Sequence, residues 1–298
     1  MSKKIISVVG PKGGIGKSTI SSNLAIALAH LGKRVTAVDL DLGGANLHIL
    51  LGIRRFEHSL DDFILKKTNS LDEILIQTGI RNLQLICGGA DIPDIANMPF
   101  QQKMKLINHL LKLEGEILIL DLAAGSSFNV VDFILIANQQ LMITSPESTS
   151  LIKVYGFIKA CIFRMLVFHF KAEQANDVLE ILAKAKDVAA HPHLKTVENI
   201  LDEAAKLNSA ATESARKMLD KFRPNIVINM VQSPEEIKTG NVIRSMLKQY
   251  LNVSSSLVTT IPTDPLVRKA LFKNEPMMLA YPGSEFSMAV RRLAEQCI

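Results

Sequence analysis

The sequence predicts an α/β protein built on a doubly wound, mostly parallel sheet. Short apolar segments alternate along the chain with longer amphipathic ones, which is typical of repeated strand–helix–strand units. Segments such as 117–120 and 225–228 lack polar alternation, as expected for strands buried on both faces of a sheet. A glycine-rich turn follows the first apolar segment directly. Together these features indicate a nucleotide-binding α/β domain.

The expected elements follow one another in chain order. We expect strands at 4–9, 34–39, 83–87, 116–121, 140–144, 224–230 and 257–261. We expect helices at 17–31, 99–112, 128–137, 148–168, 235–250 and 285–296. Right-handed crossovers bring the carboxyl ends of parallel strands to one edge of the sheet, which is where such folds bind ligands.

The turn after the first strand reads VVGPKGGIGKST over residues 8–19. Glycines allow backbone N–H groups to close around phosphate oxygens, and the dipole of the following helix favours the same anion. Lys17 would reach the β- and γ-phosphates, and the Ser18 hydroxyl would bind Mg²⁺. The predicted phosphate site comprises Gly13, Gly14, Ile15, Gly16, Lys17, Ser18 and Thr19. A chance glycine-rich turn is disfavoured because strand, loop and helix arrive in the required order.

The loop departs from the usual GxxxxGK[ST] pattern, because Pro11 replaces its first glycine. It fits the variant KGGxGK[ST], which has a second lysine, Lys12. This motif resembles the deviant Walker A motif of the MinD/ParA class of ATPases. In that class the extra lysine crosses a dimer interface and touches the phosphates held by the partner. The resemblance therefore implies an ATP-dependent homodimer, with Lys12 and Lys17 in catalytic roles.

Further segments extend the resemblance over residues 3–160 and 224–296. Residues 35–53 resemble the second strand and switch I of MinD-like proteins, and residues 117–125 resemble their Walker B region. The phrases DLDLGGANLH, TSPE and DPLVRKALF look closest to the FlhG branch of flagellar-number regulators. The resemblance implies a MinD-like P-loop fold over a single domain, 1–298.

Three aspartates are predicted at the phosphate end of the sheet. Asp121 closes an apolar strand, where a charge is costly unless Mg²⁺ lies beside it; an N-cap aspartate is the alternative. By resemblance Asp121 is the Walker B acid, Asp39 lies near Mg²⁺ and the P-loop lysine, and Asp41 positions the attacking water. The pair at 39 and 41 could also be turn-forming aspartates before Gly43 and Gly44.

Two segments, 227–230 and 261–264, resemble those that hold the adenine. The predicted base contacts are Asn229, Pro262, Thr263 and Asp264. The Asn229 amide can present both a donor and an acceptor to a base edge. An asparagine that ends a strand in a turn is the alternative.

The block at about 161–223 lies outside the resemblance and is expected to be a helical insertion. Residues 171–223 contain nine basic and nine acidic side chains, so they offer no basic stripe for DNA. The helix before it has more large apolar residues than one buried stripe requires. These are Phe157, Ile162, Phe163, Leu166 and Phe168. Either the added helices cover them, or a partner does.

Composition limits the partners. A net charge of +5 is a thin excess, and the chain has no Trp and only three Tyr, so stacking platforms for nucleic acid are not expected. The three cysteines form no CxxC pair, which weighs against zinc or an iron–sulfur cluster. The apolar residues of the last helix, 285–296, have the pattern of a face packed on the domain core rather than that of a membrane-targeting helix. We expect a cytoplasmic protein, with peripheral contact at the inner membrane or a cell pole left open.

The sequence therefore predicts a Mg²⁺-dependent ATPase that works as a dimeric switch. By resemblance it would control the number or placement of flagella or of another polar structure, with an FlhF-like GTPase or a flagellar component as partner. Two alternatives stay open. One is a ParA-like DNA-partitioning ATPase, although DNA binding is not expected. The other is a non-catalytic adaptor that holds ATP and recruits a partner through the insertion.

Overall fold

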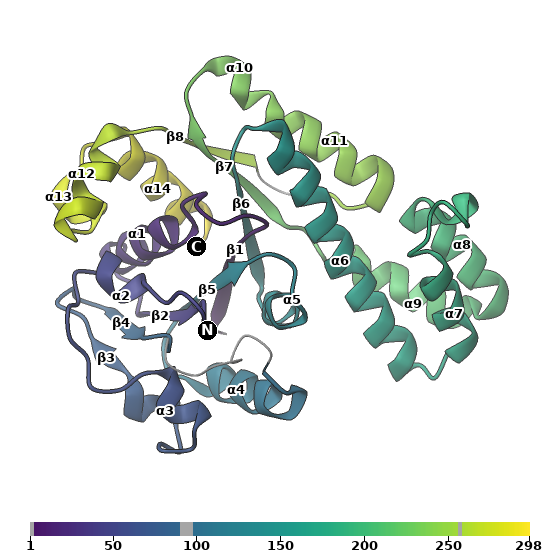
Figure 1. Cartoon of the computed structure of the whole chain (residues 1–298), viewed down its shortest axis with the longest axis horizontal. Helices are drawn as coiled ribbons and strands as arrows, with labels where there is room; N and C mark the ends of the chain where they lie inside the picture. Colours follow the sequence, from purple (N-terminus) through teal and green to yellow (C-terminus); the bar gives the residue numbers. More distant parts are fainter. Residues whose placement is uncertain (1–2, 90–97, 256–257) are drawn as a thin grey trace.

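The computed structural model describes residues 3–89, 98–255 and 258–298, and in this part of the chain eight strands form one sheet (Figure 1). The strand order is β3-β4-β2-β5-β1-β6-β7-β8, and every pair is parallel except the short edge pair β3–β4. The strands are β1 (Lys4–Gly10), β2 (Val35–Leu40), β3 (Ile76–Gln77), β4 (Leu83–Ile86), β5 (Ile117–Ala124), β6 (Gln139–Thr144), β7 (Asn225–Val231) and β8 (Val258–Pro262). The predicted doubly wound fold is confirmed.

Helices cover both faces of this sheet and create two cores. They are α1 (Lys17–His30), α2 (Leu47–Leu50), α3 (Leu60–Ile64), α4 (Phe100–Lys112), α5 (Phe128–Leu135), α6 (Ser148–Ala172), α7 (Asn176–Lys184), α8 (Val197–Leu207), α9 (Ser209–Leu219), α10 (Pro234–Ile237), α11 (Thr239–Leu251), α12 (Pro265–Lys273), α13 (Met277–Ala280) and α14 (Glu285–Gln296). Two 3₁₀ turns lie at Leu71–Ile74 and Pro192–Leu194. One core is built on α1, α13 and α14, and the other on α4, α5, α6 and α11.

The expected elements agree with the structure to within a few residues, with informative exceptions. The predicted helix at 235–250 is divided into α10 and α11, and the prediction omitted α2, α3, α12 and α13. The antiparallel edge strand β3 was also missed, because two residues carry no periodicity that a sequence pattern could reveal. Residue 257, the first of the last predicted strand, lies outside the described residues.

The register of the parallel strands fixes where their polar ends meet. Asp39 on β2 is the direct partner of Asp121 on β5, and β5 in turn pairs with β1, which leads into the glycine-rich loop. The backbone N–H of Gly125 donates to the carbonyl of Gly10 at 3.2 Å, which joins the two loops that follow these strands. Residues that are more than 80 positions apart therefore meet at one sheet edge.

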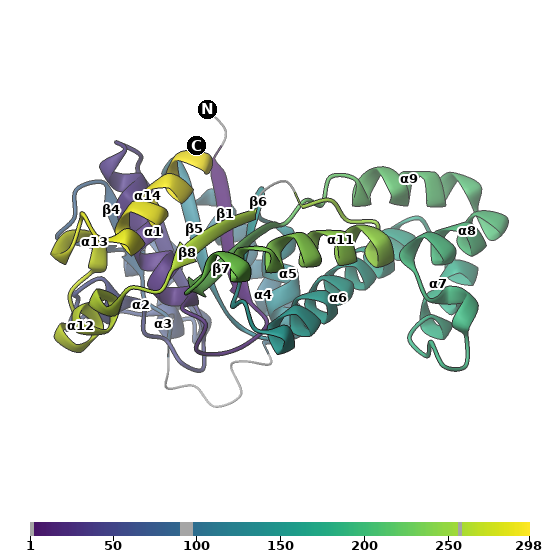
Figure 2. The same ribbon diagram turned by 90° about the horizontal axis from the view of Figure 1, so that it is seen from above.

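The insertion forms an arm that projects from one end of the sheet (Figure 2). The arm consists of the distal half of α6 with α7, α8 and α9. Phe157, Ile162 and Leu166 of α6 are at most 2% exposed, whereas Phe163 is partly buried and Phe168 is 38% exposed. The added helices therefore cover most of the surplus apolar surface of α6. Of the two alternatives, cover by the added helices therefore has more support than cover by a partner.

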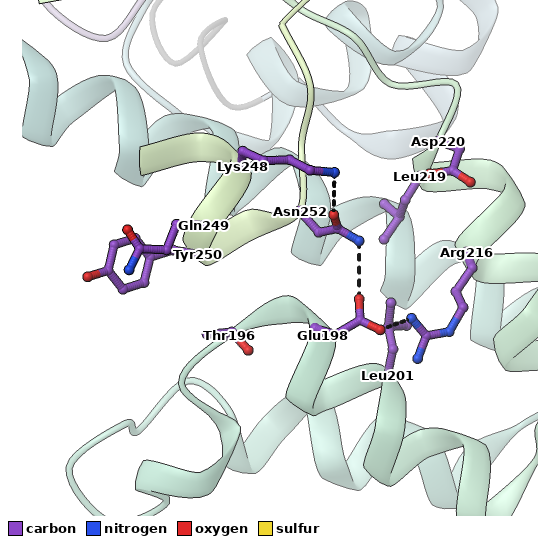
Figure 3. A pocket seen from close by; sticks show the side chains of 10 residues that line it. All are labelled: Thr196, Glu198, Leu201, Arg216, Leu219, Asp220, Lys248, Gln249, Tyr250 and Asn252. Atoms are coloured by element: carbon purple, nitrogen blue, oxygen red, sulfur yellow. Dashed lines mark hydrogen bonds and ion pairs between the residues drawn. The ribbon is translucent and has the colours of Figure 1, made fainter. Parts of the chain in front are cut away.

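Polar contacts join the arm to the end of α11 (Figure 3). Arg216 binds both Glu198 and, at 2.7 Å, Asp202. Asn252 donates to Glu198 at 3.1 Å and accepts from Lys248 at 2.9 Å. A cavity of about 460 Å³ is lined by Glu198, Arg216, Lys248 and Asn252, among others. Because most of them are half-exposed or exposed, such ion pairs contribute little stability, and the apolar contacts of α6 hold the arm.

We predict that Phe170→Ala destabilises the protein by about 3–5 kcal/mol, since its ring is 0% exposed in the core between α6 and the arm. The matched change Phe168→Ala, two residues away, should cost about 1 kcal/mol, because that ring is partly exposed and mainly loses its contact with the Arg164 guanidinium at 4.1 Å. Denaturant unfolding followed by circular dichroism measures both. Equal losses of stability in the two variants would show that α7, α8 and α9 do not pack on α6 in this way.

Candidate nucleotide-binding site

The loop between β1 and α1 has the conformation of an anion cradle. Gly14 and Gly16 have φ angles of 76° and 85°, a region that other residues adopt only with strain. A Cβ on Gly16 would lie 2.4 Å from Nδ2 of Asn229. The loop therefore requires glycine at this position both for its backbone and for its neighbour.

The side chain of Ile15 anchors the loop rather than facing a ligand. It is 3% exposed within the core under the loop, and its Cδ1 would lie 2.4 Å from a Cβ on Gly10. The Ile15 carbonyl accepts a hydrogen bond from Nδ2 of Asn229 at 2.9 Å. Ile15 was predicted in the phosphate site, but only its backbone can contact a nucleotide.

A cleft of about 670 Å³ lies beside the loop and gathers most of the predicted site. Its lining includes Gly13, Gly14, Gly16, Lys17, Ser18, Thr19, Asp41, Asn229, Pro262, Thr263 and Asp264. These residues come from four separate stretches of sequence. Four predicted residues do not line the cleft: Lys12, Ile15, Asp39 and Asp121.

The cleft also contains residues that sequence reasoning did not select. They are Asn46, Leu50, Ala124, Met230, Gln232, Val267, Arg268, Leu271 and Phe286. Several lie on α12, and a signal for that helix was present. Asp264 is its N-cap and Pro265 its first residue, a combination that marks a helix start. Residues one helical turn later could then have been assigned to the same face.

Two of the predicted base contacts already hold protein groups. Asp264 accepts from the backbone N–H of Leu266 at 2.9 Å and of Phe286 at 3.2 Å, so its carboxylate fixes the starts of α12 and α14. Asn229, at 5% exposure, is engaged by the Ile15 carbonyl. One role of both residues is therefore to hold the walls of the cleft in place.

Asp39 and Asp121 form a buried acidic pair beneath the loop. They are 0% and 1% exposed and lie opposite each other on adjacent strands. Burial raises the pKa of both carboxyl groups, and the charge of Asp121 raises that of Asp39 further. Hydrogen bonds from Ser18 and Ser21 and the charge of Lys17 oppose the rise at Asp121. The pair is thus an electrostatically costly arrangement that a cation would relieve.

The oxygens of Asp39 are committed to the backbone. Oδ1 accepts from the N–H of Asp41 at 3.1 Å, and Oδ2 accepts from Asn46 at 3.0 Å and Leu47 at 2.9 Å. Asp39 thereby shapes the turn at 41–47 and the start of α2. This geometry gives Asp39 a positioning role and includes the turn-forming role that was the alternative. Its predicted place near Mg²⁺ stays a prediction.

The residues around Asp121 fit a bound Mg²⁺. Its Oδ1 accepts from the Ser21 hydroxyl at 2.8 Å, whereas its buried Oδ2 has no hydrogen-bond partner among the described residues. An orphaned carboxylate oxygen near the Ser18 hydroxyl is a suitable environment for a magnesium ion with its water shell. In the described part of the chain, no group of three or more His, Cys, Asp or Glu side chains is arranged to hold a metal ion on its own. Mg²⁺ commonly binds through one or two carboxylates plus nucleotide phosphates.

Lys12 points away from the cleft. Its Nζ donates to Oε2 of Glu147, the residue before α6, at 2.8 Å, and the two side chains are 36% and 58% exposed. The second lysine of the loop is therefore held at the surface by a residue of the same chain.

Comparison with known proteins identifies the family. The sequence profile of the CobQ/CobB/MinD/ParA nucleotide binding domain matches residues 6–277. The chain belongs to this family. The resemblance inferred from the sequence is confirmed, and MinD/ParA proteins are generally ATPases.

Individual relatives agree with this assignment. Antiactivator FleN from Pseudomonas aeruginosa, of the FlhG branch, is 27% identical over 98% of this chain and 85% of its own length. MinD from Helicobacter pylori is 31% identical over 52% of this chain and 59% of its own length. MinD from Pyrococcus horikoshii, solved as a complex with Mg-ADP, has the same fold, with a TM-score of 0.64 at 21% identity over 99% of this chain and 95% of MinD.

We predict that Asp121→Asn changes the pH dependence of stability in the nucleotide-free MinD/ParA-type domain. The pKa of Asp121 is higher in the folded protein than in the unfolded chain. This difference stabilises the folded parent protein below pH 4, and that stabilisation is lost as the pH rises through the folded pKa. The variant cannot ionise at this position, so its stability relative to the parent should increase by about 1–3 kcal/mol between pH 4 and pH 8. Thermal unfolding in EDTA at several pH values measures this. A difference that is independent of pH would contradict the assignment.

Proposed function

We propose that this protein is an ATP-binding and ATP-hydrolysing switch that dimerises around bound ATP. The observation that carries the proposal is the pair of lysines in one loop. Lys17 lines the cleft, while Lys12 is turned out of it and is held on Glu147. A phosphate site that serves one chain alone has no use for a second lysine at the surface.

The cleft residues suggest a division of labour in hydrolysis. The glycine-rich loop and Lys17 would bind the phosphates, and this binding positions the γ-phosphoryl group and neutralises its charge. Ser18 and Asp121 would hold Mg²⁺, which would supply further charge neutralisation when bound. Asp41 lines the cleft beside Gly44, from where its carboxylate could orient the attacking water. Asp39 would keep Asp41 in place through its backbone contacts.

The ion pair of Lys12 is weak enough to be exchanged. Both partners are partly exposed, and such pairs typically contribute about 0.2–1 kcal/mol. A phosphate group of a partner-bound nucleotide would be a stronger, charge-assisted acceptor for the same ammonium. Release of Lys12 from Glu147 therefore presents only a small energetic barrier to dimerisation.

The cellular role that we propose is control of the number or placement of flagella or of another polar structure. The match to FleN, a protein of the FlhG branch, over 98% of this chain supports this process. An FlhF-like GTPase or a flagellar component is the proposed class of partner. The arm offers no excess of positive charge, so DNA partitioning is not favoured, and ATP turnover distinguishes the switch from a non-catalytic adaptor.

Lys12→Ala should weaken the ATP-dependent dimer at least tenfold, while the monomer binds nucleotide with nearly unchanged affinity. The physical reason is that Lys12 lies outside the cleft of its own chain. Light scattering with Mg-ATP and with Mg-ADP measures the mass. Glu147→Gln is the matched control, which frees Lys12 without removing it and should dimerise at least as well as the parent. If the parent protein stays monomeric with ATP, the proposal of an ATP-dependent dimeric switch is wrong.

Asp41→Ala should retain ATP affinity but lose about 100-fold or more in turnover, because a residue that orients water acts mainly in the transition state. Lys17→Ala should instead lose affinity, because its ammonium contacts ground-state phosphates. Binding of a fluorescent ATP analogue and phosphate release separate the two effects. Parental turnover in Asp41→Ala would remove this residue from the catalytic site.

A further inference from the structure

Among the described residues, the most exposed large apolar side chain lies at the end of α12. Phe272 is 90% exposed, beside Leu271 at 40%. The helix stops one residue later, and Asn274 takes a left-handed conformation with φ 55°, after which the chain turns inward to the buried Met277 and Met278. Phe272 therefore stands on a convex corner. It lines neither the nucleotide cleft nor the small gap behind it.

Basic side chains surround this corner. Lys269 and Lys273 flank Phe272 on α12 and are exposed. The loop after α2 runs alongside, since a Cβ on Gly52 would lie 3.7 Å from the carbonyl of Asn274, and this loop adds the exposed Arg54 and Arg55. Within segments 52–57 and 268–275 the sequence has five cations, including Arg268, against two glutamates. None of these cations has a carboxylate partner among the described interactions.

We propose that this surface, the Phe272 patch, docks on the face of a bilayer that contains anionic lipids. An aromatic ring within a ring of Lys and Arg has the composition of an interfacial membrane anchor, and each cation near an anionic surface adds to the affinity. A convex corner with a single projecting ring suits the headgroup region, because it needs no pocket in the partner. The inference goes beyond the proposed function, since nucleotide binding and dimerisation do not require it.

The apolar face of α14 is buried in the core of the fold. Ala289, Val290, Leu293 and Ala294 of α14 are all 0% exposed in the core against α1. Exposing them to lipid would require α14 to leave the sheet. No helix in the described part of the chain is long and apolar enough to cross a bilayer. The Phe272 patch can reach lipid without any rearrangement of the fold.

The test is cosedimentation of the full chain with vesicles of phosphatidylcholine alone or mixed with phosphatidylglycerol, at low and high salt. We expect binding to the anionic vesicles only, weakened by salt. Phe272→Ala should reduce the partition coefficient about tenfold, and Lys269→Gln with Lys273→Gln about 30-fold. The matched controls lie on the arm: Leu207→Ala, which is 55% exposed, and Lys184→Gln with Lys186→Gln. The controls should bind like the parent.

Several results would overturn the proposal. They are absence of binding to anionic vesicles, equal binding to neutral ones, and equal losses in the arm controls. Parental vesicle binding by Phe272→Ala would also overturn it. If that variant instead loses the ATP-dependent dimer in light scattering, the patch is a contact between two copies. All variants should keep parental affinity for a fluorescent ATP analogue, which separates failure of this proposal from failure of the proposed function.

Discussion

Two carboxylates face each other across adjacent strands beneath the glycine-rich loop, and much of the site can be understood as a response to that pair. Asp39 and Asp121 are excluded from water, so their charges must be compensated by neighbouring groups. Three backbone N–H groups of the turn at 41–47 serve Asp39, and Ser18, Ser21 and Lys17 serve Asp121. One oxygen of Asp121 is left without a protein donor. The compensation is incomplete, and a divalent cation beside this oxygen would complete it.

The same constraint explains why the loops around the pair have so little sequence freedom. The turn at 41–47 must present its N–H groups to Asp39, and the P-loop must bring the stem of Lys17 over Gly10, where a Cβ would lie 3.0 Å away. Asn229 then locks the P-loop from the far side through the Ile15 carbonyl. The first two contacts are local in sequence, whereas the bond between Asn229 and Ile15 joins segments that are 214 residues apart. A change at one of these contacts is therefore felt at the nucleotide cleft.

The sequence predicted the sheet and the glycine-rich turn between β1 and α1 well, because both depend on local patterns. Unbroken apolar runs such as 117–120 can be satisfied only between two layers of helix, and the glycines at 13, 14 and 16 precede a helix start. The hydrogen bonds that individual side chains make to the protein backbone were harder to predict. The capping role of Asp264 and the backbone contacts of Asp39 depend on where α14 and α2 lie, which composition does not reveal. The cleft wall on α12 was missed for a different reason, since its N-cap and Pro265 were readable but were not used.

The length of α6 has a mechanical consequence. The helix runs for 25 residues without a break, which corresponds to about 37 Å at 1.5 Å per residue. Glu147, the partner of Lys12, precedes its first turn, and the arm packs around its other end. Arg164, about two thirds of the way along α6, donates two hydrogen bonds of 2.9 and 3.0 Å to the buried Asp132 of α5. This ion pair would act as the pivot if α6 were to tilt. The helix begins 16 residues before Arg164 and ends 8 residues after it, distances of about 24 and 12 Å. A tilt of about 5° around Arg164 therefore moves the end near Glu147 by about 2 Å and the end in the arm by about 1 Å in the opposite direction.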